Sequence, residues 1–228
     1  MKIVLATGNQ DKIKEIEAIM SNIDVTLVRP DAFWGMPDVV EDGSTLKENA
    51  LKKAREIRDF TGCCALADDT GLEVEALGGA PGVRSSRYAG EHVTYDDNNQ
   101  KLLHDLDGVP VDRRTACFRC VMALALVSEV GEELYARMIA GNETDAQVAL
   151  AESGRPDALV TEGILEGRIA LAKRGQDGFG FDPLFEIPSL GETLAEMGLR
   201  RKNQISHRYR ALVEMRELLT RWKLAPER

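Results

Sequence analysis

The order of the apolar runs is the feature that most constrains the fold of this chain. Short apolar runs of strand length, over 3–6, 25–28 and 63–67, alternate with segments of helical spacing over 11–21 and after Ser44. Longer apolar runs follow in the second half. Strands that alternate with helices and then give way to a block of long strands predict an α/β protein with a mixed β-sheet. Two lobes around a central cleft are a natural arrangement of such elements.

The second half of the chain predicts the remaining elements. They are, in chain order, a helix over 93–106 that begins near Thr94, a long strand over 115–127, a hairpin partner over 134–139, a polar surface excursion over 142–156, β-rich sequence over 158–172, a glycine-rich loop over 175–183, and helices over 190–197 and 204–222. No internal repeat or linker interrupts this order, so we expect one domain over residues 1–228.

Composition excludes some classes of function. With a net charge of −9 and a pI near 5.0, the chain is a poor candidate for broad binding to nucleic acid, although a local basic cluster can still bind a small anion. The N-terminal apolar run is too short for a signal sequence, and no apolar run is long enough to span a membrane. We therefore expect a cytoplasmic protein without a membrane partner.

The cysteines allow two interpretations. The pair Cys117-x-x-Cys120 has a spacing found in zinc and redox sites, but the sequence has no second such pair. Its surroundings are apolar, where a free thiol behaves as a small hydrophobic group. We expect that pair, together with Cys63 and Cys64, to be reduced thiols in or near the core.

Two adjacent carboxylates, Asp68 and Asp69, end a short apolar run, and a glycine-rich turn is expected directly after them. Neighbouring side chains on a strand point to opposite faces, so the two acids should have different roles. One could hold Mg²⁺ through its oxygen atoms, and the other could accept a proton from water. The alternative is a polar turn in which both side chains cap backbone N–H groups.

Two further segments could hold phosphate or metal. The strand–turn–helix junction from Thr7 to Lys12 should offer backbone N–H groups and an ammonium to a phosphate, unless it is an ordinary capped surface helix. In the next helix Asn49 and Lys53 share one face, and Glu41 precedes them on the loop. The alternative there is a capping box at Ser44 or Thr45 followed by a solvated helix.

Two later segments are suited to a nucleobase. In the loop over 175–183, Phe side chains could stack on a base and Asp could accept its N–H groups, unless the aromatic rings fill the core. The segment over 201–208 is basic at the start of a helix, where cations oppose the helix dipole, so a bound anion or base would explain it. Arg208 could offer a planar fork of donors and Lys202 a charge.

These segments, in this order, closely resemble the noncanonical purine nucleoside triphosphate pyrophosphatases, which form the inosine triphosphate (dITP/XTP) pyrophosphatase family. The resemblance runs from Ile3 to about Leu219. The matching motifs are Ala67-Asp68-Asp69-Thr70-Gly71-Leu72, Gly79-Ala80-Pro81-Gly82-Val83 with Ser86-Arg87-Tyr88, Gly178-Phe179-Gly180-Phe181-Asp182-Pro183 and Ile205-Ser206-His207-Arg208. Departures are Thr70 in place of the usual Ser, Phe181 in place of Tyr, and a longer segment over 129–157.

The resemblance implies Mg²⁺-dependent hydrolysis of ITP, dITP and XTP to the monophosphate and pyrophosphate, which cleanses the nucleotide pool, by a homodimer. It implies an elongated α/β fold with a long mixed sheet and two lobes around a central nucleotide-binding cleft. Asp69 would be the general base, and Glu41, Asp68 and Asp69 would bind the metal. The implied substrate-binding residues are Thr7, Gly8, Asn9, Gln10, Asp11, Lys12 and Lys53 at the triphosphate, Thr70, and Phe179, Gly180, Phe181, Asp182, Lys202, His207 and Arg208 around base and sugar.

Two other functions remain open from the residues alone. One is a pyrophosphatase for other unusual nucleotides, such as modified pyrimidines. The other is a nucleotide sensor without catalysis, in which Asp68 and Asp69 form only a structural turn. For the purine enzyme, a donor from Arg208 or Lys202 would pair with a 6-oxo group and would face another donor in adenine.

Overall fold

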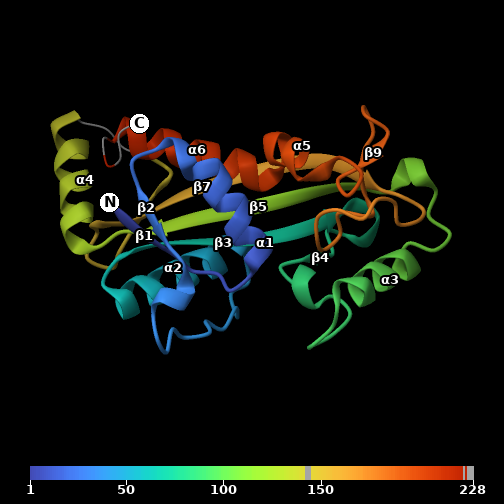
Figure 1. The fold of residues 1–228 in the computed structure, drawn as a ribbon, viewed down its shortest axis with the longest axis horizontal. Coiled ribbons are helices and arrows are strands. Elements are labelled where there is room, and N and C mark those ends of the chain that lie inside the picture. The colour runs from blue at the N-terminus through green and yellow to red at the C-terminus, as the bar shows by residue number, and fades with distance from the viewer. Residues whose placement is uncertain (142–144, 223, 225–228) are drawn as a thin grey trace. The chain divides into compact units, whose positions relative to one another are not determined.

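In the computed structural model, residues 1–141, 145–222 and 224 are described, and they form a mixed β-sheet flanked by helices (Figure 1). The strands are β1 (Lys2–Leu5), β2 (Thr26–Val28), β3 (Cys64–Val74), β4 (Pro81–Gly82), β5 (Thr115–Ala125), β6 (Val148–Leu150), β7 (Pro156–Ile169), β8 (Phe185–Ile187) and β9 (Glu192–Thr193). The helices are α1 (Gln10–Ile19), α2 (Leu46–Thr61), α3 (Tyr95–Asp105), α4 (Ser128–Gly141), α5 (Gly198–Ile205) and α6 (His207–Arg221). The predicted fold class is confirmed.

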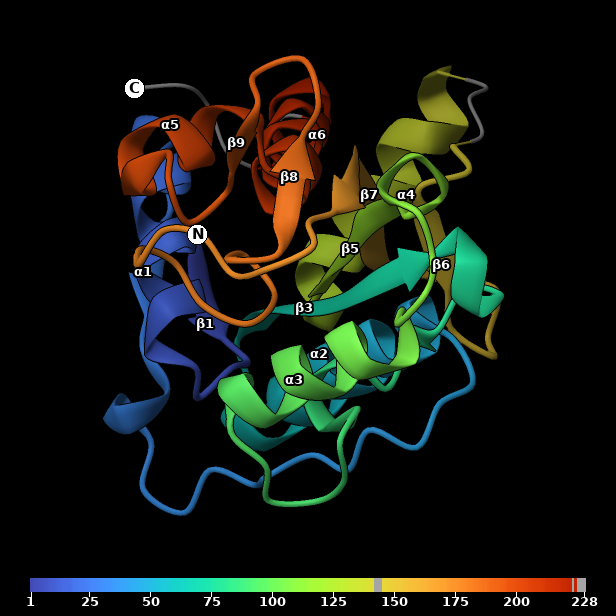
Figure 2. The same cartoon turned by 90° about the vertical axis from the view of Figure 1, so that its right-hand side faces the viewer.

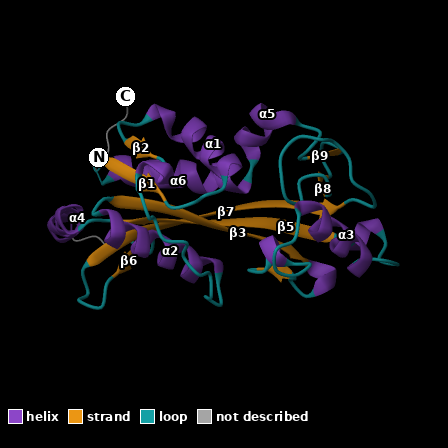
Figure 3. Cartoon of the chain, turned by 60° about the horizontal axis from the view of Figure 1, so that its bottom comes forward, coloured by secondary structure: helices purple, strands orange, loops and turns teal. Residues whose placement is uncertain are grey.

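The sheet has the strand order β2-β1-β3-β5-β7-β8-β9, with β4 paired to β3 and β6 paired to β7. Strand β1 is parallel to both β2 and β3. The pairs β3–β4, β6–β7, β7–β8 and β8–β9 are antiparallel. The long strands β3, β5 and β7 are therefore successive neighbours in the sheet. Figure 3 draws the strands in orange.

The chain divides into two compact units. Unit 1 contains residues 1–69, 121–162 and 210–228, and unit 2 contains residues 70–120 and 163–209. The division falls between Asp69 and Thr70, inside strand β3. The acidic residues of the motif over 67–72 thus belong to unit 1, and its hydroxyl residue belongs to unit 2.

Unit 1 is built on β1, whose Ile3, Val4 and Leu5 are fully buried. Helix α2 begins with a capping box, in which Thr45 accepts from the backbone of Glu48 and the Glu48 side chain accepts in return. The cap is therefore Thr45 and not Ser44, although the hydroxyl of Ser44 also donates to Glu48. These local bonds set the start of α2 and with it the position of the polar face described below.

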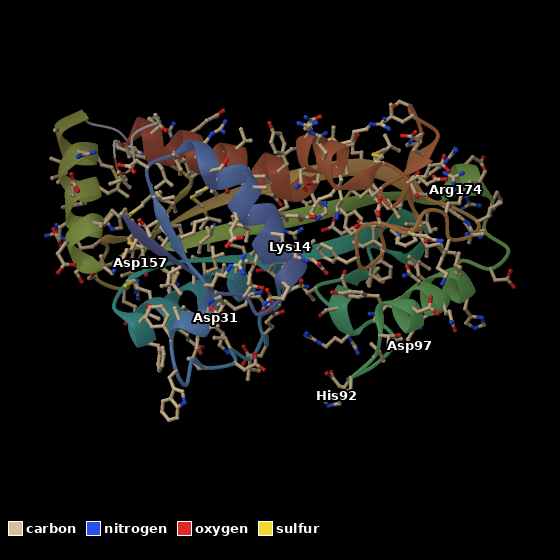
Figure 4. The ribbon with its side chains drawn as sticks, in the orientation of Figure 1. Lys14, Asp31, His92, Asp97, Asp157 and Arg174 are labelled. Carbon is tan, nitrogen blue, oxygen red and sulfur yellow. The ribbon has the colours of Figure 1, made fainter. Side chains whose placement is uncertain are left out.

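Unit 2 has its own core, in which side chains of β3, α3, β5 and β8 pack together, among them Leu72, Leu102, Phe118 and Phe185. Figure 2 shows α3 in green and β8 in orange. Helix α3 begins where predicted, at a capping box between Thr94 and Asp97, the latter labelled in Figure 4. Its C-terminal end is held by Arg114, whose buried guanidinium donates to the carbonyls of Leu106 and Val109 and to that of Ala170.

Several predicted elements were wrong. Strand β3 does not end at Asp68 but continues to Val74, because it pairs with β1 in its first half and with β4 near its end. Residues 134–139 belong to helix α4 and not to a hairpin strand. The apolar run there is short, and periodicity cannot separate strand from helix at that length.

Two further boundaries differ. Residues 190–197 form no helix: Glu192 and Thr193 pair with β8, and Leu194 and Met197 fill the core of unit 2. The expected surface excursion over 142–156 contains β6, which pairs with β7. Residues 142–144 of that excursion lie outside the described residues. The helix expected over 204–222 begins at His207.

The four cysteines are free, as expected for reduced thiols; Cys64 and Cys120 are buried, and Cys63 and Cys117 are partly buried. Burial and the neighbouring carboxylate of Glu73 raise the pKa of Cys117 to about 11, so its thiolate is scarce at neutral pH. None of the described helices is long and apolar enough to cross a membrane.

Candidate functional site

The two adjacent carboxylates of β3 reach different helices of unit 1. The Oδ2 atom of Asp68 lies 2.9 Å from the ammonium of Lys12 in α1. The Oδ2 atom of Asp69 accepts from the side-chain amide of Asn49 in α2, at 3.1 Å. Alternation along the strand explains why the acids diverge. Both are buried, so each carboxylate depends on its polar neighbours within the protein.

Lys53 is the centre of this cluster of unit 1. Its ammonium lies 2.6 Å from Oε1 of Glu41 and 3.5 Å from Oδ1 of Asp69. It also donates to the backbone carbonyl of Asp68, at 2.7 Å. Burial alone would lower the pKa of Lys53, but Asp69, Asp68 and Glu41 outweigh burial and raise it. The lysine therefore stays charged, and the helical spacing of Asn49 and Lys53 brings both to one carboxylate.

Asp69 has the properties of a proton acceptor. Burial raises the pKa of its carboxyl group, and the positive charge of Lys53 opposes that shift in part. A raised pKa makes a carboxylate a better base toward water than a solvated one. Its Oδ2 atom is oriented by Asn49, whose own Oδ1 accepts from the backbone of Gly43 at 2.7 Å. Asn49 was recognised in sequence as sharing the face of Lys53, but its contact with Asp69 was not foreseen.

The same oxygens suit a magnesium ion. Glu41 and Asp69 already share one cation, the Lys53 ammonium, so their oxygen atoms converge. Across the described residues, no group of three or more His, Cys, Asp or Glu side chains could hold a metal. Mg²⁺ is commonly bound through one or two carboxylates together with water and substrate phosphates, and a set of this size fits that pattern. The side chain of Asp68 pairs with Lys12 instead of joining the other two acids.

The expected phosphate-binding segment is only partly available at its backbone. The Oδ1 atom of Asn9 accepts from the N–H groups of Asp11 and Lys12, so the helix N-terminus is capped from within. Asp11 pairs with Lys14, which Figure 4 labels on α1. The Thr7 hydroxyl accepts from the Asn9 N–H. The group of this segment that contacts the acidic residues of β3 is the Lys12 ammonium, which pairs with Asp68.

The remaining residues of that segment differ in what they can offer. Gly8 has open space where a side chain would stand, so an approaching ligand would meet no Cβ there. Gln10 is the first residue of α1, and its side chain is exposed. Lys12 is thus the residue by which the predicted segment from Thr7 to Lys12 contacts Asp68.

In unit 2 the Phe179 ring lies against two cations. The ammonium of Lys202 is 4.4 Å from the ring centroid, and the guanidinium carbon of Arg208 is 5.6 Å from it. Both distances are within the range of cation–π attraction. Phe179 is partly buried, whereas Lys202 and Arg208 are almost fully buried. An aromatic face and two fixed donors are thus gathered in one place.

Asp182 holds this arrangement together. Its Oδ2 atom accepts from the Lys202 ammonium at 2.6 Å and from the Phe179 N–H at 2.9 Å. Gly178 makes room for it: φ is +78° there, and an added Cβ would lie 2.2 Å from Asp182 Oδ2. Only glycine fits both the backbone conformation and the close approach. The glycine-rich character of the loop therefore follows from the position of one buried acid.

Arg208 reaches back to the first residue of unit 2 on strand β3. Its Nη2 atom donates to the Thr70 hydroxyl at 3.3 Å. The usual Ser would supply the same acceptor, so the methyl group of Thr70 does not remove this bond. Two predicted contacts are placed differently. His207 stacks on Phe118 with ring centroids 4.6 Å apart, and Phe181 is buried in the core of unit 2. Phe181 thus fills the core, as the alternative interpretation expected, and its contact with the nucleotide stays a prediction.

Similarity to known proteins extends over the whole chain. The model of the Ham1 family matches residues 3–218. A dITP/XTP pyrophosphatase of Desulforamulus reducens is 43% identical over 221 residues, which are 97% of this chain and 96% of that relative. A dITP/XTP pyrophosphatase of Geobacter sulfurreducens is 42% identical over 96% of each chain. The solved structure of a HAM1 protein from Coxiella burnetii has a TM-score of 0.79 and 38% identity, and the match covers 97% of this chain and 99% of that one.

Proposed function

Because the chain belongs to the Ham1 family, we propose that it hydrolyses dITP, XTP and ITP to the monophosphate and pyrophosphate with the help of Mg²⁺. The chain is a nucleoside triphosphate pyrophosphatase, a hydrolase of acid anhydrides. The resemblance noted in the sequence is thereby confirmed at the level of the family. The choice of purine, the metal and the residue roles are the proposal.

Unit 1 supplies the groups for the hydrolytic step. Asp69 accepts a proton from the attacking water, since its raised pKa favours that transfer and Asn49 orients it. Lys53 and Lys12 neutralise charge on the phosphates, the main requirement of phosphoryl transfer. Glu41 and Asp69 would hold Mg²⁺, which when bound would stabilise negative charge on phosphate oxygens.

Unit 2 supplies the groups for the base. The face of Phe179 can stack on a purine, as aromatic side chains do with nucleobases. Arg208 and Lys202 offer only donors, which suit the 6-oxo acceptor of hypoxanthine and xanthine and oppose the 6-amino group of adenine. A buried donor that faces another donor costs about 1–3 kcal/mol, enough for strong discrimination against ATP.

The observation that carries this proposal is the convergence of Glu41, Asp69 and the Asp68 carbonyl around the Lys53 ammonium, with Asn49 bonded to Asp69. A nucleotide sensor would need the cations but not a buried carboxylate with a raised pKa. The test is pyrophosphate release from dITP, XTP, ITP, GTP, ATP, dUTP and methylated pyrimidine triphosphates, with and without Mg²⁺. Faster turnover of the pyrimidines, or no release from any substrate, would overturn the proposal.

The oligomeric state and the location of the protein remain predictions from the family resemblance. A homodimer in solution is checked by sedimentation equilibrium, and a mass of 25.1 kDa, that of one chain, would contradict it. A cytoplasmic location is checked by fractionation of the cells that make the protein.

A further inference from the structure

Helix α3 contains two adjacent buried asparagines that no motif accounts for. Asn98 and Asn99 are each only 3% exposed, although the helix is otherwise polar on its outer side. Asparagine is a weak helix former and is costly to bury unless its amide is bonded. Their burial therefore calls for specific partners, and the two residues have different ones.

Asn99 is directed to the loop that carries Phe179. Its Nδ2 atom donates to the carbonyl of Gly180 and to the carbonyl of Tyr95, each at 2.9 Å. Both partners are acceptors, so the amide can be oriented only with its nitrogen toward them. Its Oδ1 atom is buried and has no hydrogen-bond partner within the part of the chain that the structure describes. One side chain thus ties the first turn of α3 to the loop.

The two residues tied by Asn99 are neighbours of Phe179, one in sequence and one in space. Gly180 is the next residue in the chain, and the Tyr95 ring contacts the Phe179 ring with centroids 6.1 Å apart. The N–H of Phe179 is already held by Asp182. The Asp182 side chain therefore fixes the peptide that precedes Phe179, and Asn99 fixes the Gly180–Phe181 peptide, one residue further along the loop. Gly180 has φ +62°, and no atom lies within 4 Å of an added Cβ there.

Asn98 makes its two side-chain bonds elsewhere. Its Oδ1 atom accepts from the Ala89 N–H at 2.8 Å, and its Nδ2 atom donates to the Ser86 carbonyl at 3.1 Å. It orders residues 86–89, not the loop of Phe179. The chain thus offers a neighbour of equal burial and equal chemistry as a control.

We propose that Asn99 is a positioning residue for base recognition, which sets the orientation of the Phe179 ring by holding the Gly180 carbonyl. This inference rests on the proposed function, because it assigns Phe179 to the base. Loss of the amide frees the loop to rotate at Gly180, which has a left-handed backbone conformation. The ring then meets the base in several orientations, and binding that depends on the base is weakened.

The experiment compares Asn99→Ala with Asn98→Ala. The Kd of inosine monophosphate and the Kd of inorganic triphosphate are measured for both variants by calorimetry, with thermal unfolding as a check on the fold. We expect Asn99→Ala to raise the Kd of inosine monophosphate by about tenfold, which corresponds to the loss of one oriented contact. The Kd of inorganic triphosphate should change less than about twofold. Asn98→Ala should reduce thermal stability to a similar degree and leave the ratio of the two Kd values unchanged.

The outcomes separate the inference from the function it rests on. If Asn99→Ala weakens the binding of both ligands equally, or of neither, the positioning role is overturned, even if the wild type hydrolyses dITP. A wild type that binds inosine monophosphate but does not hydrolyse dITP overturns the proposed function alone. If Asn99→Ala does not fold, Asn99→Leu keeps the volume and the helix without the donor, and the same ratio of Kd values decides.

Discussion

The two units each bury a lysine against a carboxylate, and they use it differently. Lys53 in unit 1 and Lys202 in unit 2 each lie 2.6 Å from an acid, that of Glu41 and that of Asp182. Lys53 also meets Asp69 and a backbone carbonyl, so it is surrounded by oxygen atoms. Lys202 also lies over the Phe179 ring, 4.4 Å from its centroid. The first environment suits phosphate, metal and proton transfer, and the second suits recognition of a flat ring.

Removal of Mg²⁺ should have the largest effect and should act through unit 1. We expect exhaustive chelation to abolish pyrophosphate release, and Ca²⁺ to restore it poorly, because the larger ion relaxes the octahedral geometry that Mg²⁺ imposes on phosphates. The measurement is the rate after chelation and after return of each ion. Equal rates with Ca²⁺, or full activity after chelation, would contradict the assigned role of Glu41 and Asp69.

Asp69→Asn should lower kcat by about a thousandfold, since an amide of the same shape cannot accept the proton. The Kd of dITP should change little. Burial raises the pKa of Asp69, so ionisation of this carboxyl group lowers the stability of the folded state as pH rises through that pKa. Because an amide does not ionise, Asp69→Asn should not destabilise the protein at neutral pH. Asp59→Asn, a surface change on α2, is the control. Near-normal turnover in the purified Asp69→Asn variant would falsify the assignment as general base.

Lys202→Met should have a larger effect on the stability of the fold than on turnover. It leaves the Asp182 carboxylate buried without its ammonium, and breaking a buried pair in this way costs about 3–5 kcal/mol. If the Lys202 ammonium mainly neutralises charge, the turnover of the Lys202→Ala variant should fall by a similar factor for every purine substrate. Urea unfolding measures the first effect, and addition of Asp182→Asn should restore part of it. A Lys202→Met protein as stable as wild type would show that the pair is not desolvated.

Arg208→Ala should act on the choice of base. We expect kcat/KM for ITP and XTP to fall roughly ten- to a hundredfold relative to ATP, because a charged hydrogen bond to the 6-oxo group costs about 1.5–3 kcal/mol to lose. The panel of ITP, XTP, GTP and ATP is the measurement. If all four substrates fall by one factor, Arg208 is a phosphate-binding or structural residue, and base recognition belongs to the loop over 179–182.

The smallest expected effect is that of pH on the wild type. Since burial raises the pKa of Asp69, its carboxyl is protonated at pH values where a solvated acid is already ionised. Activity should therefore rise with pH through that pKa, by up to about tenfold per unit below it, and level off toward alkaline pH. In Asp69→Asn this limb of the profile should vanish. A profile of kcat that is flat from acid to neutral pH would contradict the shift.

Local patterns in the sequence were sufficient for some of these features. The period of 3.6 residues places Asn49 and Lys53 on one face of α2, and the period of two separates Asp68 from Asp69. Capping signals locate the starts of α2 and α3 to within a residue. Where a pattern was short, as over 134–139, the prediction failed, because a few apolar residues fit a strand and a helix equally well.

The sequence by itself determined the family, the class of fold and the types of polar and aromatic residues that each unit contributes, because these depend on spacing and composition along the chain. Only the tertiary structure decided which groups meet. Phe179 and Phe181 are two residues apart in the same loop, yet one ring lies against Lys202 and the other fills the core. Lys53 contacts Glu41 and Asp69, which are 12 and 16 positions away from it in the sequence. Such contacts depend on how helices and strands pack, and no local period records that packing.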